Sequence, residues 1–398
     1  MIMEFFNDTL DNLLEGLIDY RGKTPIKPTS GLPLVTAKII KNGVINEFNE
    51  FIAERDYDRW MVRGFPKQGD VVLTTEAPIG EVAQLDERKI ALAQRVVCLR
   101  GKSGVLNNTY LKYYFLSNYG KKKLKSRESG TTVTGIKQSE LRKVEVCYPS
   151  FENQCKIASI LSSLDSKIEN NRKICANLEA QAQALFKHWF IDFAPFKDGK
   201  FVESELGMIP EGWRVGKLTD ILENIKDTTK QGDYPELPYL PIDSIPMNSF
   251  LVKDIKDNSE AQSSLILFKK YDILIGAMRV YFHRVIPAPF DGITRSTCFV
   301  VRPKVWNYYS FALCSVNSNQ AILHAQKTSK GSTMPYAVWE GGLGAFSIVI
   351  PPESVAREFD YLIKKYINII QYAYFENQKL TTLRDTLLPK LMSGEIKV

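Results

Sequence analysis

The sequence is poor in the side chains that most often carry catalysis or bind metals. Its 398 residues include three histidines, His188, His283 and His324, and six cysteines, none of which form a C-x-x-C pair. These numbers give little support to a histidine-based active site or a zinc site, so we expect no catalytic residue, no metal and no cofactor. The cysteines lie in apolar stretches, which indicates reduced, packed thiols and a cytoplasmic protein.

Long apolar runs are also missing. The longest ones are short and interrupted by charges, and Met1-Ile2-Met3-Glu4 shows no basic leader before an apolar stretch. We therefore expect neither a membrane segment nor secretion. Lysine and arginine outnumber aspartate and glutamate by 52 to 45, and the net charge of +7 allows binding to a polyanion without requiring it.

Two kinds of segment resemble enzyme motifs without matching them. Residues 16–24 (GLIDYRGKT) come near a phosphate-binding P-loop, but five residues separate the glycines where the motif has four. The extra residue would misalign the backbone N–H groups that hold phosphate. Residues 351–353 (PPE) and 341–344 (GGLG) supply neither the Pro-Pro-aromatic motif nor the cofactor loop of a DNA methyltransferase. The residues therefore argue against a P-loop or methyl-transfer enzyme.

What the sequence does contain is an internal repeat, offset by about 202 residues. Residues 69–73 (GDVVL) resemble 271–275 (YDILI), and residues 129–132 (SGTT) resemble 330–333 (KGST). A period this long indicates two copies of a whole domain, because the units of a solenoid span only a few tens of residues. Two similar domains suggest two similar ligands, or one ligand with two half-sites.

The first repeat has a mixed pattern that predicts an α+β domain. Its short β-like runs alternate with Gly, Pro and Asn turns, and Pro149-Ser150 ends it. The expected strands cover residues 34–37, 71–74, 95–99 and 144–146, and a helix is expected over 109–117.

Each repeat is followed by a long heptad pattern. A helix of about 38 residues would be roughly 57 Å long, too long to be covered by one domain. We therefore expect the two helices to form an antiparallel coiled coil, with Asn171 and Asn377 fixing its register. The alternative is that each helix packs onto its own domain. The seam consists of Ile157, Leu161, Leu164, Ile168, Asn171, Cys175, Leu178, Ala182, Leu185 and Trp189, and of Phe359, Ile363, Tyr366, Ile370, Ala373, Asn377, Leu380, Leu387 and Leu391, with Arg384 as its one charged position.

Four segments carry a resemblance to a known family. Residues 178–193 (LEAQAQALFKHWFIDF) resemble the central spacer of type I restriction-modification specificity (S) subunits, and residues 204–213 (SELGMIPEGW) resemble the entry into the second domain of that family. Residues 383–396 (LRDTLLPKLMSGEI) are similar to the distal spacer, and residues 19–25 (DYRGKTP) to the start of a first recognition domain.

This resemblance implies a DNA-binding, non-catalytic subunit with pseudo-two-fold symmetry. In the family, each α+β domain reads one half of a bipartite double-stranded DNA target. The helices set the spacing and dock two methyltransferase (M) subunits, which restriction (R) subunits can join. The domains would be recognition domain 1 at 1–150, the central spacer helix at 151–198, recognition domain 2 at 199–352 and the distal spacer helix at 353–398. The alternative function is a stand-alone bipartite DNA-binding regulator without a modification partner.

Candidate DNA contacts in the first repeat are cations and hydroxyls. A basic helix end leads into a hydroxyl-rich loop, a combination that suits phosphates and base edges. The alternative is a solvated helix face. The candidates are Arg21, Lys23, Lys121, Lys122, Lys123, Lys125, Arg127, Ser129, Thr131 and Thr132.

The second repeat offers candidates where it diverges from the first. Arg279, Tyr281, His283, Arg284 and Arg295 replace Ala77, Ile79, Glu81, Val82 and Ala93, and Arg can bind guanine with two hydrogen bonds. Ordinary surface or core roles remain the alternative. The matching basic, hydroxyl-rich loop contributes Lys327, Lys330, Ser332 and Thr333.

Partner contacts are expected on the outward faces of the helices. Phe186, Trp189, Phe190 and Phe193 place four aromatic side chains within eight residues, more than one seam can bury. We interpret them as a candidate methyltransferase dock. The alternative is that they fill the junction with the second domain.

Overall fold

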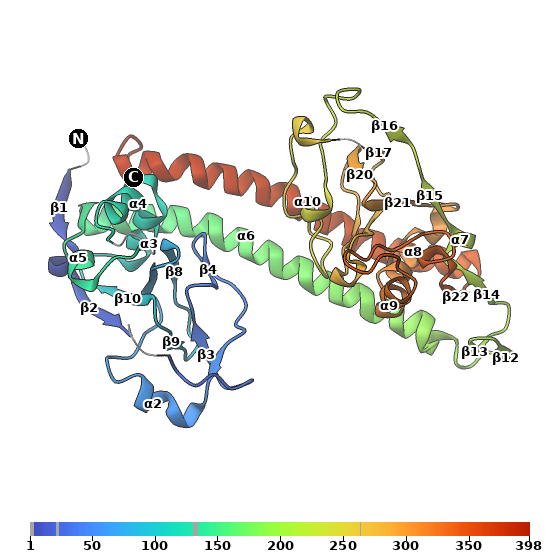
Figure 1. The fold of residues 1–398 in the computed structure, drawn as a ribbon, viewed down its shortest axis with the longest axis horizontal. Helices are drawn as coiled ribbons and strands as arrows, with labels where there is room; N and C mark the ends of the chain where they lie inside the picture. Colours follow the sequence, from blue (N-terminus) through green and yellow to red (C-terminus); the bar gives the residue numbers. More distant parts are fainter. Residues whose placement is uncertain (1–3, 21–23, 130–133, 263) are drawn as a thin grey trace. The chain divides into compact units, whose positions relative to one another are not determined.

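The computed structural model describes all of the chain except residues 1–3, 21–23, 130–133 and 263 (Figure 1). The chain forms two compact units. Unit 1 consists of residues 1–167 and 379–398, and unit 2 of residues 168–378. Both long helices are divided between the units. Unit 1 therefore combines two separate stretches of sequence, whereas unit 2 is one continuous stretch.

Unit 1 is built on a four-stranded antiparallel sheet in the order β2-β10-β7-β8. A two-stranded ladder of β1 with β11 and a small sheet β6-β3-β9 complete its strands, together with the β4–β5 pair. Its elements are β1 (Phe5–Thr9), α1 (Leu10–Leu13), β2 (Leu14–Asp19), β3 (Leu32–Val35), β4 (Ile40–Lys41), β5 (Val44–Ile45), β6 (Phe51–Ile52), α2 (Tyr57–Trp60), β7 (Val71–Thr75), β8 (Ile79–Gln84), β9 (Ala91–Leu92), β10 (Val96–Gly101), α3 (Asn108–Leu116), α4 (Asn118–Lys125), α5 (Gln138–Arg142) and β11 (Glu145–Pro149).

Unit 2 repeats this topology. Its four-stranded antiparallel sheet has the order β15-β21-β18-β19, and β14 pairs with β22 as β1 pairs with β11. Its elements are β12 (Phe201–Ser204), β13 (Gly207–Pro210), β14 (Arg214–Lys217), α7 (Leu218–Ile221), β15 (Leu222–Ile225), β16 (Thr228–Thr229), β17 (Leu265–Phe268), β18 (Ile273–Gly276), β19 (Val285–Pro287), β20 (Gly292–Arg295), β21 (Cys298–Pro303), α8 (Tyr309–Val316), α9 (Asn319–Lys327) and β22 (Ser347–Ile350). The predicted α+β class and internal repeat are confirmed.

The repeat extends to individual hydrogen bonds. In unit 1 the buried carboxylate of Asp70 accepts from Arg100 Nε at 2.8 Å, and in unit 2 that of Asp272 accepts from Arg302 Nε at 2.7 Å. The N-caps of α4 and α9 are repeated too. Ser117 Oγ accepts the N–H of Gly120 at 3.1 Å, and Ser318 Oγ accepts that of Ala321 at 3.2 Å. These caps satisfy N–H groups that a helix start leaves unpaired.

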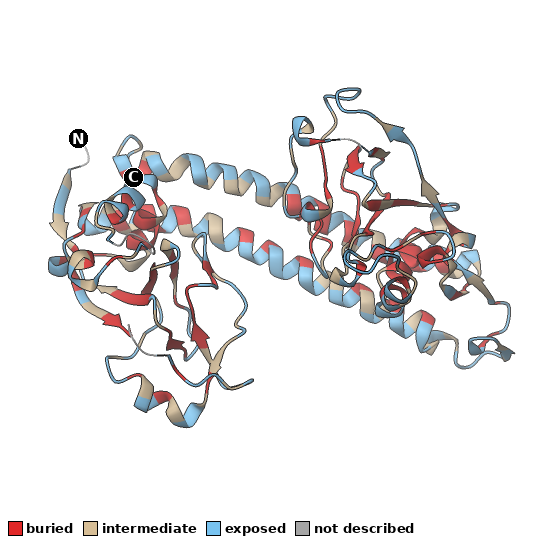
Figure 2. Ribbon diagram, viewed as in Figure 1, coloured by how far each residue is buried: buried red, intermediate tan, exposed pale blue. Residues whose placement is uncertain are grey.

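Two long helices, α6 (Phe151–Phe186) and α10 (Glu353–Ser393), pack against each other in antiparallel directions. In unit 1, Ile157 and Leu161 of α6 share a core with Leu391 of α10, and in unit 2, Phe186 of α6 packs near Phe359. All the seam positions named above are buried or half-buried, whereas exposed positions follow the outer faces (Figure 2). The predicted antiparallel pair is confirmed.

Polar seam residues are paired where the two helices meet. In unit 1, Arg384 Nη1 lies 2.9 Å from Asp165 Oδ1, so an acidic partner compensates the one charge in the seam. In unit 2, Asn171 Nδ2 donates to Asn377 Oδ1 at 2.9 Å and to Glu376 Oε2 at 2.6 Å.

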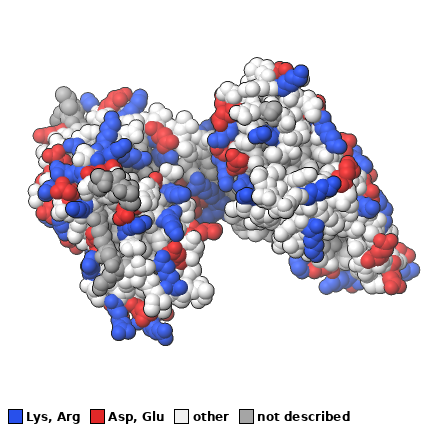
Figure 3. Space-filling model, viewed as in Figure 1, with Lys and Arg blue, Asp and Glu red and all other residues white. Residues whose placement is uncertain are grey.

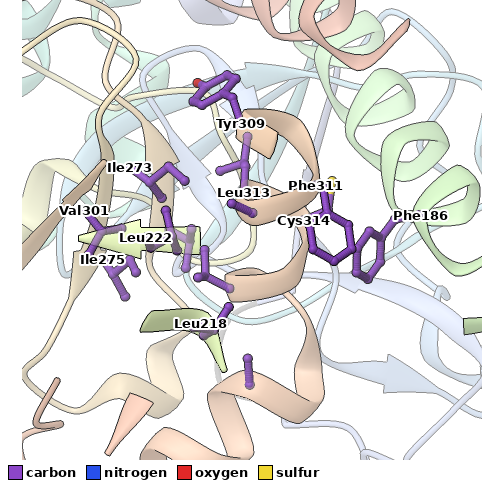
Figure 4. Close-up of a cluster of buried hydrophobic side chains, with 14 of the residues drawn as sticks. Phe186, Leu218, Leu222, Ile273, Ile275, Val301, Tyr309, Phe311, Leu313 and Cys314 are labelled. Carbon is purple, nitrogen blue, oxygen red and sulfur yellow. The ribbon is translucent and has the colours of Figure 1, made fainter. Parts of the chain in front are cut away.

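The core of unit 2 lies between its sheet, α8 and the long helices. Figure 4 shows Phe311 of α8 beside Phe186 of α6, while Ile273 and Val301 approach from the sheet. α6 therefore packs against the globular part of unit 2 as well as against α10. The alternative in which each helix packs only onto its own sequence repeat does not hold.

Candidate nucleic-acid interface

A pair of loops in unit 2 is joined by backbone hydrogen bonds into one frame. The N–H of Lys330 donates to the carbonyl of Tyr336, and the N–H of Tyr336 donates to the carbonyl of Lys330, both at 2.9 Å, so residues 330–336 form a short hairpin. The N–H of Arg279 donates to the carbonyl of Pro335 at 2.8 Å, and that of Ala337 to Ala277 at 2.8 Å. The hairpin is thereby fixed beside the segment that follows β18. We name residues 277–284 and 330–337 the unit 2 loop pair.

Unit 1 contains the same frame. Ser129 and Gly135 exchange backbone hydrogen bonds of 2.9 and 3.0 Å, and the N–H of Ile136 donates to the carbonyl of Thr75 at 2.9 Å. Glu76 also forms an isolated antiparallel β-bridge with Gly135, and Met278 forms the equivalent bridge with Tyr336 in unit 2. The described residues that flank this loop in unit 1 therefore form the same backbone bridges as their counterparts in unit 2.

The side chains on these two frames differ in size and charge. The bridges align Lys330 with Ser129 and Tyr336 with Gly135, while Arg279 takes the place of Ala77. Arg279 and Lys330 are exposed, and the positive φ of 49° at Arg279 belongs to the turn that begins η6 (Val280–Phe282). Unit 2 thus projects long side chains where unit 1 has small residues.

The predicted contacts of unit 2 divide into two groups. Arg279 and Tyr281 lie on the first segment of the loop pair, with Lys330, Ser332 and Thr333 on the hairpin, and all five side chains are exposed. Lys327 is exposed at the end of α9. These residues share one surface region.

Three other predicted contacts of unit 2 are engaged or lie elsewhere. Arg284 Nη1 donates to the carbonyl of Ile242 at 2.8 Å and to that of Ile245, and His283 Nε2 lies 2.9 Å from Asn317 Oδ1. These side chains hold neighbouring loops together. Arg295, on β20, is exposed but lines a separate hollow with Tyr239, Asp243, Lys256 and Glu260.

The basic stretch of unit 1 is only partly free of acidic partners. Lys123 Nζ lies 2.9 Å from Glu145 Oε2, and this hydrogen bond raises the pKa of Lys123. Arg127 Nη1 lies 3.2 Å from Glu140 Oε2. Lys121, Lys122, Lys125 and Ser129 are exposed, whereas the predicted contacts Arg21, Lys23, Thr131 and Thr132 lie outside the described residues.

Basic side chains do not form one continuous patch on the face shown in Figure 3, where lysine and arginine alternate with acidic residues on each unit. The interface is therefore defined by the loop frames and their side chains more than by gross charge. Scattered cations of this kind suit individual phosphate contacts.

Two of the four aromatic side chains proposed as a dock, Phe186 and Phe190, lie in the interior of unit 2. Phe190 is 3% exposed, with its ring centroid 4.8 Å from those of both Phe311 and Phe359, and Phe186 is 6% exposed. Phe193 is half-buried against Trp213. Their geometry favours the alternative that they fill the junction with the second domain. Trp189 differs, because it borders a surface hollow.

An apolar stripe that the sequence analysis missed lies on the outer face of α10. Tyr361 and Tyr372 are 67% and 68% exposed, and Leu362 and Ile369 are exposed beside them. Trp189, Arg357, Glu358, Tyr361 and Leu362 line the hollow at one end of the stripe. The signal was present in the sequence as apolar residues at positions outside the heptad seam. We name Tyr361, Leu362, Ile369 and Tyr372 the α10 stripe.

Other kinds of site find no support in the described part of the chain. There, no three His, Cys, Asp or Glu side chains come together in a way that could hold a metal ion. Over the same residues, no helix has the length and apolar character needed to cross a membrane. Gly16, the first glycine of the P-loop-like segment, lies within β2 and pairs with β10.

Comparisons with known proteins identify one family. A family model for the type I restriction modification DNA specificity domain matches residues 22–180. The MjaIX specificity subunit of Methanocaldococcus jannaschii is 32% identical over 394 residues, which cover 92% of this chain and 87% of that protein. The HindI specificity subunit of Haemophilus influenzae is 23% identical, covering 62% of this chain and 68% of that protein.

A solved structure has a similar fold. The crystal structure of a type I restriction-modification system S subunit from M. genitalium aligns with a TM-score of 0.63 at 15% identity, covering 98% of this chain and 96% of that one. This likeness concerns the fold, whereas the 32% identity to the MjaIX subunit over most of both chains shows the family. The chain belongs to the specificity (S) subunits of type I restriction-modification systems, the non-catalytic subunits that provide DNA specificity.

Proposed function

We propose that the two units of this specificity subunit read the two halves of a bipartite double-stranded DNA target, one half each. The single observation that carries the proposal is the loop frame that occurs twice, with matching backbone bridges and different side chains. A shared frame positions both units on DNA in the same way, while different side chains select different bases.

The proposed domain assignment follows the two repeats. Residues 1–150 and 199–352 form the recognition domains, and residues 151–198 and 353–398 form the spacer helices. The helices set the distance between the half-sites, and the DNA between these half-sites is not read. Arg279, Lys330 and the exposed lysines of α4 supply contacts to DNA in this arrangement.

The proposed partners are two methyltransferase subunits, with restriction subunits able to join them. We assign one methyltransferase contact to the α10 stripe, because its exposed tyrosines are amphipathic side chains of the kind enriched at protein interfaces. Phe186 and Phe190 are not part of this proposed contact, since both are buried.

The function is tested by methylation mapping. The purified chain, assembled with its methyltransferase subunits, is incubated with a random DNA library, and methylated positions are sequenced. We expect one split target with two defined segments and an undefined spacer of fixed length. A single continuous target would refute the reading of one half by each unit. Specific DNA binding without methylation in the assembled complex would instead support a stand-alone regulator.

The docking surface is tested by the double variant Tyr361→Ala/Tyr372→Ala. Both residues are about two-thirds exposed, so the fold should be retained in the variant. Methyltransferase binding should weaken by about tenfold or more, the loss typical of an interface hot spot. Binding is measured by titration calorimetry. Tyr234→Ala, at an exposed tyrosine outside both helices, is the matched control. Unchanged binding by the folded double variant would exclude this surface.

A further inference from the structure

The hairpin of the unit 2 loop pair exposes two large apolar side chains to water, although apolar side chains are more stable when covered. Tyr336 is 44% exposed and Met334 is 55% exposed, within three residues of each other. Arg279 and Lys330 flank them on the same backbone frame. Apolar side chains set among cations suit a ligand that is anionic at its rim and apolar further in.

Tyr336 is held in position before any ligand arrives. Its N–H and carbonyl both bond to Lys330, and its ring lies over the backbone of Gly331, where an added Cβ would stand 3.7 Å from two ring carbons. Gly331 has a φ of +87°, which a residue with a side chain adopts only with strain. The backbone that carries the ring is therefore ordered before binding, which reduces the ordering cost that binding would otherwise pay.

The shape of the hairpin favours the major groove of DNA. That groove is wide enough to admit a protein element such as a helix or a two-stranded ribbon. Residues 330–336 form a narrow exposed loop, closed at its base by one bridge between Lys330 and Tyr336. Within the major groove, the 5-methyl group of thymine is the apolar feature of the base edges. Arginine and lysine at the sides can meet phosphates or guanine.

We propose, on the basis of the proposed reading of one half-site by unit 2, that Tyr336 and Met334 recognise the 5-methyl group of a thymine in that half-site. Unit 1 cannot make the equivalent contact through Gly135, which has no side chain at the position of Tyr336. A contact through Tyr336 is therefore specific to the half-site that unit 2 reads. The two units would then contact their half-sites through different kinds of side chain.

The test replaces each thymine of the mapped target, one at a time, by deoxyuridine, which differs only by the missing methyl group. Dissociation constants are measured for the complex assembled with methyltransferase subunits. For the unaltered chain, one replacement in one half-site should weaken binding by about fourfold, the value of one buried methyl group. In Tyr336→Ala/Met334→Ala, the same replacement should have no further effect.

Three controls keep the test specific. Tyr336→Phe retains the ring and should keep the sensitivity to deoxyuridine, as should Tyr234→Ala, an exposed tyrosine 40% accessible outside the loop pair. The single variant Met334→Ala, at an exposed position, provides a second probe if the double variant melts earlier than the unaltered chain. It should reduce the effect of the replacement.

The outcomes separate this inference from the proposed function. If the unaltered complex binds its mapped target no better than unrelated DNA, the proposed function is wrong. If it binds specifically but no thymine replacement matters, or if the Tyr336 and Met334 variants keep the full sensitivity, the inference about the methyl group is overturned. A sensitivity lost through these variants in both half-sites would also overturn it.

Discussion

At the scale of single residues, the internal repeat shows where the two copies differ, but it does not show whether a differing side chain is free to bind DNA. Arg279 replaces Ala77 and is exposed on the loop frame, as the comparison of repeats suggested. Arg284 replaces Val82 in the same comparison, yet it donates to the carbonyl of Ile242, 42 residues away in sequence. A contact over such a separation leaves no local pattern, so the sequence could not distinguish the two arginines.

Tyr336 was missed although the two repeats align at this hairpin. Residues 129–132 and 330–333 correspond at an offset of 201, which places Tyr336 opposite Gly135, as the hydrogen-bonded bridges also do. The candidates chosen from this loop were cations, serine and threonine, so the substitution of glycine by tyrosine was passed over.

One half-buried carboxylate on α6, that of Glu179, gives a prediction about pH. Glu179 Oε1 accepts from Ser249 Oγ at 3.0 Å and from the N–H of Phe250 at 2.9 Å, but burial dominates and raises the pKa of Glu179 above 4.5. Because the folded state binds this proton more tightly than the unfolded state does, ionised Glu179 destabilises the fold at neutral pH. That cost disappears as the pH falls through the raised pKa.

Glu179→Gln should therefore melt at a higher temperature than the unaltered chain at pH 7. The amide oxygen can still accept both hydrogen bonds, while the buried charge is gone. The difference in melting temperature should shrink as the pH is lowered towards 4.5, and calorimetry at a series of pH values measures it. A difference that stays constant with pH would show that the charge of Glu179 is not its cause.

At the scale of elements, the heptad spacing was sufficient to predict two long helices and their antiparallel contact. Spacing alone did not assign the aromatic side chains at the end of α6, because the surfaces that cover them come from distant parts of the chain. Phe190 contacts Phe311 of α8 and Phe359 of α10. The π-helical turn η2 (Lys187–Ile191), which follows α6, contains Phe190.

Phe190→Ala should destabilise unit 2 by about 3–5 kcal/mol, the usual cost of removing a buried phenylalanine. Urea unfolding followed by tryptophan fluorescence measures the change, since Trp213 lies 5.8 Å from the Phe190 ring. Tyr361→Ala, on the exposed stripe of α10, should change the free energy of unfolding by less than about 0.5 kcal/mol. Equal effects of the two variants would contradict the assignment of one side chain to the core and the other to the surface.

At the scale of the whole molecule, the two ends of the chain belong to one unit. The repeats in the sequence suggest two successive halves, but residues 379–398 pack with residues 1–167, and Leu391 and Met392 enter the core that contains Ile157 and Leu161. The antiparallel helix contact produces this exchange. The sequence repeat assigns residues 379–398 to the second copy, but their packing makes them part of unit 1, so we expect them to unfold with it.

Removing residues 379–398 should therefore loosen the N-terminal unit. We expect faster amide hydrogen exchange in α3, whose Tyr110 and Leu111 share the core with Leu391, and little change in α8 of unit 2. Hydrogen exchange followed by mass spectrometry compares the truncated and full chains. Faster exchange confined to α8 would contradict the division of the molecule into these two units.

The central claim, that each unit reads its own half of the target, is tested most directly by altering one loop pair and mapping methylation again. In Arg279→Ala/Lys330→Ala, both altered side chains are exposed and lie on unit 2. One half of the methylated sequence should become degenerate, while the other half and the spacer length stay as they are in the unaltered complex. Equal loss of definition in both halves, or a changed spacer length, would contradict the claim.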